Sequence, residues 1–492
     1  PLDHLTNRLS QKADKEFLYL KRRINPDEAQ KILAHKIPGV FSQREFRRFY
    51  PQGPAMAHVL GFTNIDDRGQ EGLELAFDDW LRGTPGAKRV IRDRRGQIVE
   101  SVDLVRAAQP GRDLALSIDR RIQYLAHREL RNAINLTGAS SGSAVVLDVA
   151  TGEVLAMVNF PTFNPNAVGT SPRDAHRNRA VTDLMEPGST MKPLTVAAGL
   201  EAGVITTTSL FNTSPGWIPN GKYRTTDTHN YGVLDTTGVI RKSSNVGASL
   251  IAKRLGDAQF DAFLRRFGYG HVTGSGFPGE AAGLFPNHQR WSGTSKQTIS
   301  YGYGLNATPL QIATAYAALG NGGLLHQPSF VKGQHGTPKQ VLDPVIANQV
   351  LHMMQTVTEP GGTATQAAIL GYHVAGKTGT SRKASAGGYS RRYIGYFAGL
   401  VPVEKPRFAM VVAVNDPTKG SYYGGIVSGP VFRNVMEGAL RMMDVSPDNL
   451  DAWLAAQAAA EAKRAKAAGH PVPVTAMADA GTTPAPAAGA LQ

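Results

Sequence analysis

Two hydrophobic periods alternate along this chain, and each change of period predicts a change from helix to strand. After residue 119, apolar residues recur every third or fourth position on one side of a predicted helix: Ile122, Leu125, Leu130 and Ile134. From Gly142 the period shortens, and Thr151-Gly152 separates two apolar runs that end at Val158. This second pattern predicts a β-hairpin.

The later part of the chain predicts a long helical section and then more strands. Thr308-Pro309-Leu310-Gln311 has the residues of a capping box with proline at the first helical position. Strands are predicted after it, followed by a closing helix: Tyr372–Thr380, Tyr393–Val401, Arg407–Val414, then Ser428–Met442. We therefore expect an α+β domain, with one mainly antiparallel sheet shared by both ends of the domain and helices on its faces.

Before this domain lies a charge-rich section that ends at the turn Pro110–Asp113. It predicts a short helix over Ala29–His35, strand ends and turns at Arg48–Pro51 and His58–Phe62, and a hairpin around Asp93–Gly96. We expect residues 1–113 to form a β-rich accessory domain without catalytic groups, residues 114–446 to form the α+β domain, and residues 447–492 to form a tail. The tail is predicted to be helical over Asp451–Ala468 and disordered in its last twenty or so residues.

Composition narrows the classes of function. The chain has 492 residues, a formal net charge of +14 and no cysteine. The lack of cysteine excludes disulfides, thiolate nucleophiles and Cys-type zinc sites. The positive charge suits an anionic membrane face or polymer. The basic residues are dispersed and form no nucleic-acid module, so we expect no nucleic-acid partner.

Ser189 and Lys192 are the first candidates for chemistry. Residues three apart on a helix share a face, and a lysine with a lowered pKa can take the proton of a serine hydroxyl. Pro187-Gly188 marks a helix start just before the pair. Taken alone, however, Ser189 is better explained as a helix cap, because a serine before a helix usually has that role. Ser329 and Lys332 have the same spacing in a strand-like stretch, where residues three apart point to opposite faces and cannot cooperate.

Two further motifs follow in order along the chain. Ser243-Ser244-Asn245 lies between two predicted helices, where a turn would hold its hydroxyl and amide toward a cleft. Lys377-Thr378-Gly379-Thr380 lies on a predicted late strand, where Lys and Thr groups can bind a carboxylate and Gly379 lets a ligand backbone approach. Each motif has a structural alternative, a helix cap for the first and an edge strand protected by lysine for the second. The order of all three, each on its own element, is what indicates catalysis.

These motifs together resemble the class B penicillin-binding proteins, and other segments resemble their septal, cell-division type. The resemblance to class B pedestal domains lies in Arg48–Pro51, His58–Phe62 and Gly69–Glu74, and the resemblance to the septal type lies in Ser300–Leu305, Gly387–Tyr389 and Tyr422–Gly425. The resemblance covers most of residues 20–445. It implies a non-catalytic pedestal domain followed by a transpeptidase domain, with a five-stranded mainly antiparallel sheet, flanking helices and a helical subdomain. Asn245 also leans toward the septal type, because elongation-type relatives more often have Asp at that position.

The resemblance implies a serine D,D-transpeptidase that cross-links septal peptidoglycan and is inactivated by β-lactams. Ser189 would attack the penultimate D-Ala carbonyl of a stem peptide, with Lys192 as the base and Ser243 relaying the proton. Asn245 would bind the amide side of the donor, and Lys377, Thr378 and Thr380 would hold its terminal carboxylate. The backbone N–H groups of Ser189 and Thr380 would form the oxyanion hole. Tyr422 and Tyr423 would wall the site, although ordinary packing explains them as well.

Other functions remain open from the residues alone. A D,D-carboxypeptidase would use the same motifs with water as the acceptor. A serine β-lactamase shares the motifs but needs a means of deacylation, and no such Glu motif lies between Asn245 and Lys377. A non-catalytic divisome scaffold or β-lactam sensor is the alternative outside enzymes, and the intact motifs argue against it.

Partners and location follow only from the resemblance. It implies peptidoglycan stem peptides and β-lactams as ligands, divisome proteins including a SEDS-type glycan polymerase as partners, and neither cofactor nor metal. The chain opens with Pro1-Leu2-Asp3 and has no apolar run long enough to span a bilayer. We expect that a single N-terminal membrane helix precedes it, and that this part lies in the periplasm, attached to the bacterial inner membrane.

Overall fold

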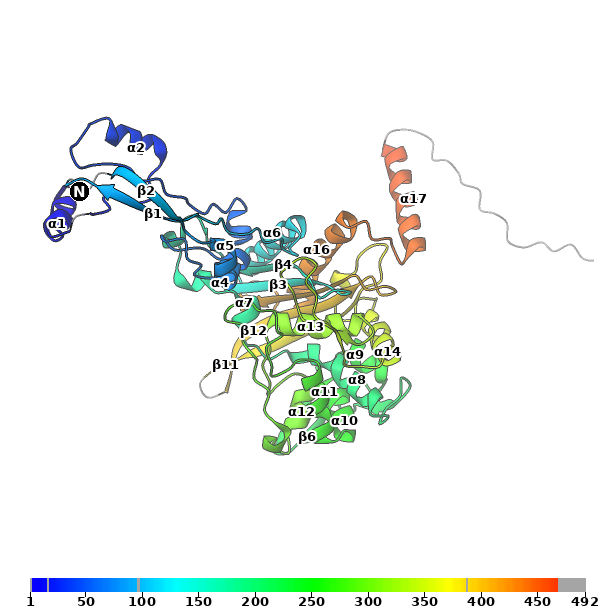
Figure 1. The fold of residues 1–492 in the computed structure, drawn as a ribbon. Coiled ribbons are helices and arrows are strands. Elements are labelled where there is room, and N and C mark those ends of the chain that lie inside the picture. The colour runs from blue at the N-terminus through cyan, green and yellow to red at the C-terminus, as the bar shows by residue number, and fades with distance from the viewer. Residues whose placement is uncertain (1, 16, 95–97, 386–387, 468–492) are drawn as a thin grey trace, which may run out of the picture.

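A central antiparallel sheet carries the structure, a computed structural model that describes residues 2–15, 17–94, 98–385 and 388–467 (Figure 1). Its five strands follow the order β11-β12-β13-β3-β4. Their bounds are β3 Ser141–Asp148, β4 Val154–Phe160, β11 Ala375–Ser385, β12 Gly388–Val401 and β13 Phe408–Asn415. Strand β13 pairs with β3, and every pairing in the sheet is antiparallel. The predicted sheet shared by both ends of the domain is therefore confirmed.

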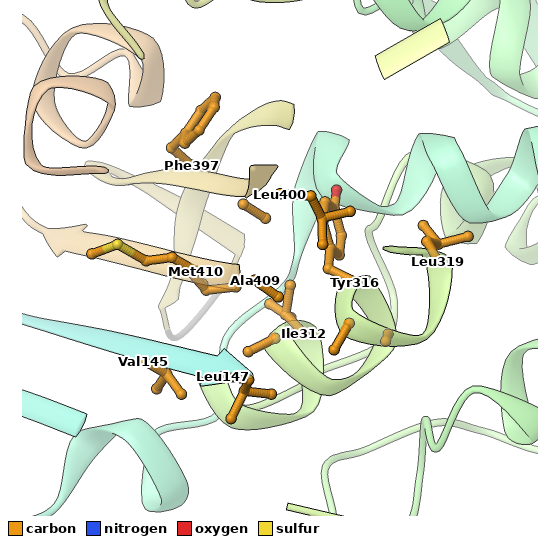
Figure 2. Close-up of a cluster of buried hydrophobic side chains, with 14 of the residues drawn as sticks. Val145, Leu147, Ile312, Tyr316, Leu319, Phe397, Leu400, Ala409 and Met410 are labelled. Atoms are coloured by element: carbon orange, nitrogen blue, oxygen red, sulfur yellow. The ribbon is translucent and has the colours of Figure 1, made fainter. Parts of the chain in front are cut away.

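Helices cover both faces of this sheet, as predicted. Helices α6 (Arg120–Thr137) and α16 (Gly429–Met442) pack together on one face, and α13 (Pro309–Gly320) lies on the other. The two faces can be followed on β12: the Phe397 ring meets Phe432 of α16 with ring centroids 4.8 Å apart, whereas Leu400 faces the end of α13. Figure 2 shows α13 side chains packed against the sheet, among them Ile312, Tyr316 and Leu319.

The capping box predicted for α13 is present. The Thr308 hydroxyl accepts a hydrogen bond from the backbone N–H of Gln311, and the Gln311 side chain accepts one from the N–H of Thr308. These two bonds satisfy donors that would otherwise be unpaired at a buried helix start.

A helical subdomain is inserted between β4 and β11. Its α-helices are α7 Arg179–Thr182, α8 Lys192–Glu201, α9 Thr236–Arg241, α10 Asn245–Arg254, α11 Asp257–Arg266, α12 Ser295–Ser300 and α14 Pro344–Gln355, in addition to α13. Its short strands are β5 Leu210–Asn212, β6 Trp217–Asn220, β7 Tyr223–Thr226, β8 Val233–Asp235, β9 Leu324–Leu325 and β10 Lys339–Gln340. Its 3₁₀ turns are η2 Val168–Thr170, η3 Arg173–His176, η4 Gly188–Met191, η5 His288–Arg290 and η6 Thr365–Ala367. Helices α8 to α12 and α14 occupy the lower part of Figure 1, whereas α7 and α13 lie against the sheet.

The N-terminal region contains the predicted hairpin, β1 (Ala87–Arg92) with β2 (Ile98–Arg106). Within its described residues, the other regular elements are helical: α1 Leu2–Ser10, α2 Pro26–Leu33, η1 Gly53–Ala55, α3 Ala57–Leu60, α4 Gly72–Ala76 and α5 Asp78–Arg82. The region is therefore less rich in strands than we expected. In particular, His58–Leu60 form a helical turn rather than a strand end, because Val59 is buried in the core of the α+β domain.

The C-terminal end of the described chain also follows the prediction. A short helix, α15 (Gly424–Val427), precedes α16, and α17 (Leu450–Ala467) forms the predicted tail helix. In Figure 1, α17 stands apart from the sheet. The predicted disorder of the last residues lies outside the described residues. Among the described helices, none is both long and apolar enough to cross a membrane.

Candidate active site

Ser189 lies on the 3₁₀ turn η4, which leads directly into α8. Gly188 before it has φ +56°, a left-handed conformation that favours glycine. Buried contacts fix this turn: the Gly188 N–H donates to Gly302 O, and the Tyr316 hydroxyl of α13 donates to Thr190 O at 2.8 Å. The serine is therefore held on a rigid support, and it is only partly exposed.

Lys192 is the first residue of α8, and its side chain is fully buried. Its Nζ lies 2.7 Å from three oxygens: Ser189 Oγ, Ser243 O and Asn245 Oδ1. Burial lowers the pKa of Lys192 to about 7, and the negative charge of Asp227 opposes that shift. A neutral amine can donate to Ser243 O and Asn245 Oδ1 and direct its lone pair at Ser189, which is the geometry of a general base.

Ser243 occupies the predicted turn between α9 and α10, with φ +59°. Its Oγ lies between two amines, 2.8 Å from Lys377 Nζ and 3.2 Å from Lys192 Nζ. The helix cap that could have explained the triplet is Ser244, whose Oγ accepts the Gly247 N–H. Ser243 is left free for the site because its neighbour caps the helix.

The Asn245 side chain is held from both ends. Its Oδ1 accepts from Lys192 Nζ, and its Nδ2 donates to Thr226 O at 2.9 Å. The amide orientation is therefore set by one donor and one acceptor on opposite sides.

Lys377 lies on β11, an edge strand of the sheet, but it is not a protective surface lysine. Its side chain is fully buried and reaches inward to Ser243 Oγ and to Thr378 O. Burial lowers the pKa of Lys377 well below its usual value, and the charge of Lys192 lowers it further. A carboxylate bound beside it would favour the charged form again.

The other residues of this motif hold β11 in place. The Thr378 hydroxyl pairs with that of Thr363 at 2.8 Å, and Thr380 Oγ1 accepts the Gly424 N–H at 3.2 Å. A Cβ on Gly379 would lie 3.2 Å from Pro187 O and 3.2 Å from Thr190 Cγ2. The missing side chain at Gly379 thus lets the serine-bearing turn pack on β11, and the approach of a ligand backbone at this residue stays a prediction.

Tyr422 and Tyr423 form an aromatic stack next to Thr380. Their rings lie 4.7 Å apart, and Tyr422 also stacks on Tyr393 of β12 at 4.1 Å. Gly424, which follows them, packs so close to the sheet that a Cβ would lie 2.4 Å from Gly379 O. The stack is thus placed beside the Lys377–Thr380 strand, although its outer ring, Tyr423, is half exposed.

Ser329, the second match to the serine–lysine spacing, lies away from this cluster. Its hydroxyl donates to Val331 O and accepts from Val331 N, and the segment forms isolated bridges rather than a continuous strand. The motif order in the sequence therefore selected the serine that the structure places beside a buried lysine.

Two residues at the site were not found from the sequence. Asp227, after β7, accepts three hydrogen bonds from the Ser244–Val246 turn. Glu186, three residues before Ser189, accepts from the Gly304 N–H and the Tyr389 hydroxyl. A polar residue at a loop end gives no periodic signal, so only the folded arrangement identifies these two.

Known proteins resemble both parts of the chain. Residues 142–437 match the penicillin binding protein transpeptidase domain, and residues 2–116 match the penicillin-binding protein dimerisation domain. The chain is 46% identical over 452 residues to the peptidoglycan D,D-transpeptidase FtsI of Escherichia coli K12, covering 92% of this chain and 76% of that protein. It is 44% identical over 452 residues to the probable peptidoglycan D,D-transpeptidase PenA of Neisseria meningitidis serogroup A, covering 91% of this chain and 77% of that protein.

A solved structure gives the same result for the α+β domain. The apo transpeptidase domain of penicillin-binding protein 3 from Burkholderia pseudomallei superposes with a TM-score of 0.63 at 38% identity, covering 69% of this chain and 99% of that one. Sequence, fold and the ordered motifs agree. The chain belongs to the penicillin-binding protein family, with the peptidoglycan D,D-transpeptidases FtsI and PenA among its relatives.

Proposed function

We propose that this protein is a septal peptidoglycan D,D-transpeptidase in which Ser189 is the nucleophile. The observation that carries the proposal is the contact between Ser189 Oγ and Lys192 Nζ at 2.7 Å, made by an amine whose pKa burial has lowered to about 7. A substantial fraction of Lys192 is then neutral at neutral pH, and it can accept the serine proton as the hydroxyl attacks.

In the proposed acylation, Ser189 Oγ forms a bond to the penultimate D-Ala carbonyl carbon of the donor stem peptide. The peptide bond to the terminal D-Ala breaks, and the serine proton passes through Lys192 and Ser243 to the leaving amine. The chain of contacts from Ser189 to Lys192 to Ser243 supports this route. An amine of a neighbouring stem peptide then forms the new amide bond, and Ser189 Oγ regains a proton from that amine.

Developing negative charge on the attacked carbonyl oxygen would be stabilised by the backbone N–H groups of Ser189 and Thr380. The serine-bearing turn lies close to Thr380, which supports this role. A Cβ added at Gly188, the residue before Ser189, would lie 3.9 Å from Thr380 N. The donor carboxylate would bind at Lys377, Thr378 and Thr380, its amide side at Asn245, and Tyr422 and Tyr423 would wall the cleft. A β-lactam would enter as a mimic of D-Ala-D-Ala and leave a slowly hydrolysed acyl-enzyme.

The test is covalent labelling with a fluorescent penicillin, followed by mass spectrometry and peptide mapping. We expect one adduct, on Ser189, and no labelling of Ser189→Ala. Ser329→Ala is the matched control, because Ser329 has the same sequence spacing to a lysine and should leave labelling intact. Undiminished labelling of Ser189→Ala would overturn the assignment of the nucleophile.

The same adduct separates the alternative activities. A stable, stoichiometric adduct is expected of a transpeptidase, whereas steady turnover of penicillin would indicate a β-lactamase. Incubation with a donor peptide and an amine acceptor should give the cross-linked product. Release of D-Ala without that product would indicate a carboxypeptidase. A protein that is labelled by penicillin but catalyses neither reaction would be a sensor or scaffold.

The cellular setting is also part of the proposal. The resemblance to FtsI supports a role in septum formation, together with divisome proteins that include a SEDS-type glycan polymerase. We place this part of the protein in the periplasm, attached by a single N-terminal helix to the inner membrane. Purification of the natural protein with its membrane fraction, and recovery of the polymerase with it, would test both points.

We propose the domain division of the sequence as well: a pedestal over residues 1–113, a transpeptidase domain over 114–446 and a tail over 447–492. The matches to the two family models and the projecting hairpin β1–β2 support this division. Limited proteolysis with mapping of the first cleavage sites would test it.

A further inference from the structure

A second cavity lies at one end of the catalytic sheet, and its lining includes neither the serine nor the two buried lysines of the active site. It has a volume of about 270 Å³, and its walls come from β3, β11, β12 and β13 and from residues 177–185. The charged side chains that line it are Arg177, Arg179, Asp183 and Lys383. Three cations thus share one carboxylate, and the cavity suits a negatively charged group.

Arg179 has an unused donor in this cavity. The residue is buried, with only 7% of its surface exposed, and its two terminal nitrogens pair with Asp174 and Asp183. Arg177 also uses Asp183, at 2.6 Å, so this carboxylate is already shared. Arg179 Nε, however, has no hydrogen-bond partner among the described residues. Buried donors are almost always paired, so this N–H indicates a place for a ligand atom.

Lys383 brings a further positive charge to the cavity from β11. Burial lowers the pKa of Lys383, and the neighbouring charge of Arg392 lowers it further. The nearby carboxylate of Asp416 opposes this shift, but it is already bound by Arg392, whose Nε lies 2.7 Å from Asp416 Oδ2. An anion bound beside Lys383 would favour its charged form again.

Asn415 supplies an unused acceptor on the same cavity wall. Its Nδ2 donates to Ser141 Oγ at 2.7 Å, whereas its Oδ1 has no partner within the described part of the chain. The cavity is therefore lined by one unpaired donor and one unpaired acceptor. A carboxylate next to a peptide N–H would satisfy both, so a peptide fits this lining better than a simple inorganic anion does.

The cavity also lies in the direction in which the donor peptide would run. Under the proposed function, Lys377 and Thr378 hold the terminal carboxylate, and the Thr380 N–H meets the attacked carbonyl. Lys383 follows Thr380 by three residues on the same strand, a distance of about 10 Å. An extended donor would cover that distance with two or three residues upstream of the attacked carbonyl.

We propose that this cavity is a subsite for the donor peptide, in which Arg179 and Lys383 bind a second carboxylate carried upstream of the attacked D-Ala carbonyl. The inference rests on the proposed function and adds a specificity site that the three motifs do not contain. It predicts that the protein prefers donors with a free acid at this upstream position over donors in which that acid is an amide.

The experiment measures transfer of donor peptides to an amine acceptor, with each upstream carboxylate of the donor amidated in turn. For the parent protein, one of these amidations should raise KM by about tenfold, the effect expected for loss of one charge-assisted hydrogen bond. The kcat should change little, because the contact is present before and during the reaction. Lys383→Gln should show the same rise with the unmodified donor, and no further rise with that amidated donor.

Lys405→Gln is the matched control, because Lys405 is exposed and does not line the cavity. This variant should keep the KM of the parent for every donor. The inference is overturned if the parent accepts all the amidated donors with unchanged KM, if Lys383→Gln keeps the parent's KM, or if the effects of amidation and substitution multiply.

Inorganic phosphate separates a peptide site from a simple anion site. Phosphate that inhibits the parent but not Lys383→Gln, while amidated donors react like unmodified ones, would identify a phosphate site and would also overturn the inference. A parent protein that penicillin does not label would instead overturn the proposed function.

Discussion

At the scale of single residues, burial of charge controls this site. Lys192 and Lys377 are fully buried within reach of the Ser243 hydroxyl, and the negative charge of Asp227 opposes the lowering of the pKa of Lys192. Isolated buried ammonium groups are costly, so the folded protein favours the neutral amine of Lys192. The neutral amine is the form that could accept the Ser189 proton in the proposed reaction.

The pH dependence of acylation follows from this residue. Since Lys192 must be neutral to accept the Ser189 proton and its pKa is about 7, the acylation rate should rise with pH through that value. Below it the rate should fall about tenfold per pH unit. Stopped-flow labelling with fluorescent penicillin between about pH 5 and about pH 9 would measure the profile. A rate that is flat across this range would contradict Lys192 as the base.

At the scale of elements, the site is a junction of three: the turn η4, the α9–α10 turn and the edge strand β11. Each of the three is held by a hydrogen bond to another element. Tyr316 of α13 bonds η4, and Asp227, which follows β7, bonds the α9–α10 turn. Gly424 of α15 bonds Thr380 of β11. These supports restrict the three motifs to one relative geometry. The close contact of η4 with β11 depends on the absence of a side chain at Gly379.

Gly379→Ala tests this junction. The added Cβ would lie 3.0 Å from Tyr396 Cδ2 and 3.2 Å from Pro187 O, so β11 and the serine-bearing turn must move apart. We expect a loss of about 1–3 kcal/mol in the free energy of unfolding and a slower acylation. Urea denaturation and penicillin labelling would measure the two effects. Gly293→Ala, at a position with open space around it, should leave both unchanged.

At the scale of the whole molecule, part of the N-terminal region belongs physically to the α+β domain. Met56, Val59 and Leu73 lie in the same buried cluster as the sheet. His58 Nε2 donates to Ala175 O at 2.9 Å, and the imidazole is almost fully buried. The projecting hairpin β1–β2 and the catalytic sheet are thus joined by a packed segment rather than by a free linker.

His58 makes this junction sensitive to acid. Burial lowers the pKa of His58 to about 4, whereas an exposed histidine titrates near ~6.5. The unfolded chain therefore binds the proton first as pH falls. The contribution of His58 to stability is complete above about pH 6.5 and is lost between there and pH 4, up to roughly 3 kcal/mol.

Thermal unfolding of the parent and of His58→Gln over this pH range would measure the effect. The variant should lose less stability between about pH 7 and about pH 4 than the parent does. The exposed His229 supplies the control, because His229→Gln should keep the parent's pH dependence. Identical pH dependence in His58→Gln and the parent would show that burial of His58 does not contribute.

The sequence alone determined the order of elements and the identity of the chemistry. Hydrophobic periodicity and the cap at Thr308 are local properties, since they depend on side chains a few residues apart. The predicted hairpin, the late strands and the α+β class were therefore confirmed. The three motifs in their order selected Ser189 over Ser329, because each motif carries its chemistry within four residues.

Only the tertiary structure decided what depends on residues distant in sequence. The helical turn at His58–Leu60, which we expected to be a strand end, forms because Val59 finds its partners in another domain. The burial of Lys192 and Lys377, the packing around Gly379 and the hydrogen bond from Ser244 Oγ to Asp227 all arise where separate elements meet. A lowered pKa is a property of surroundings, so no spacing of residues along the chain could have supplied it.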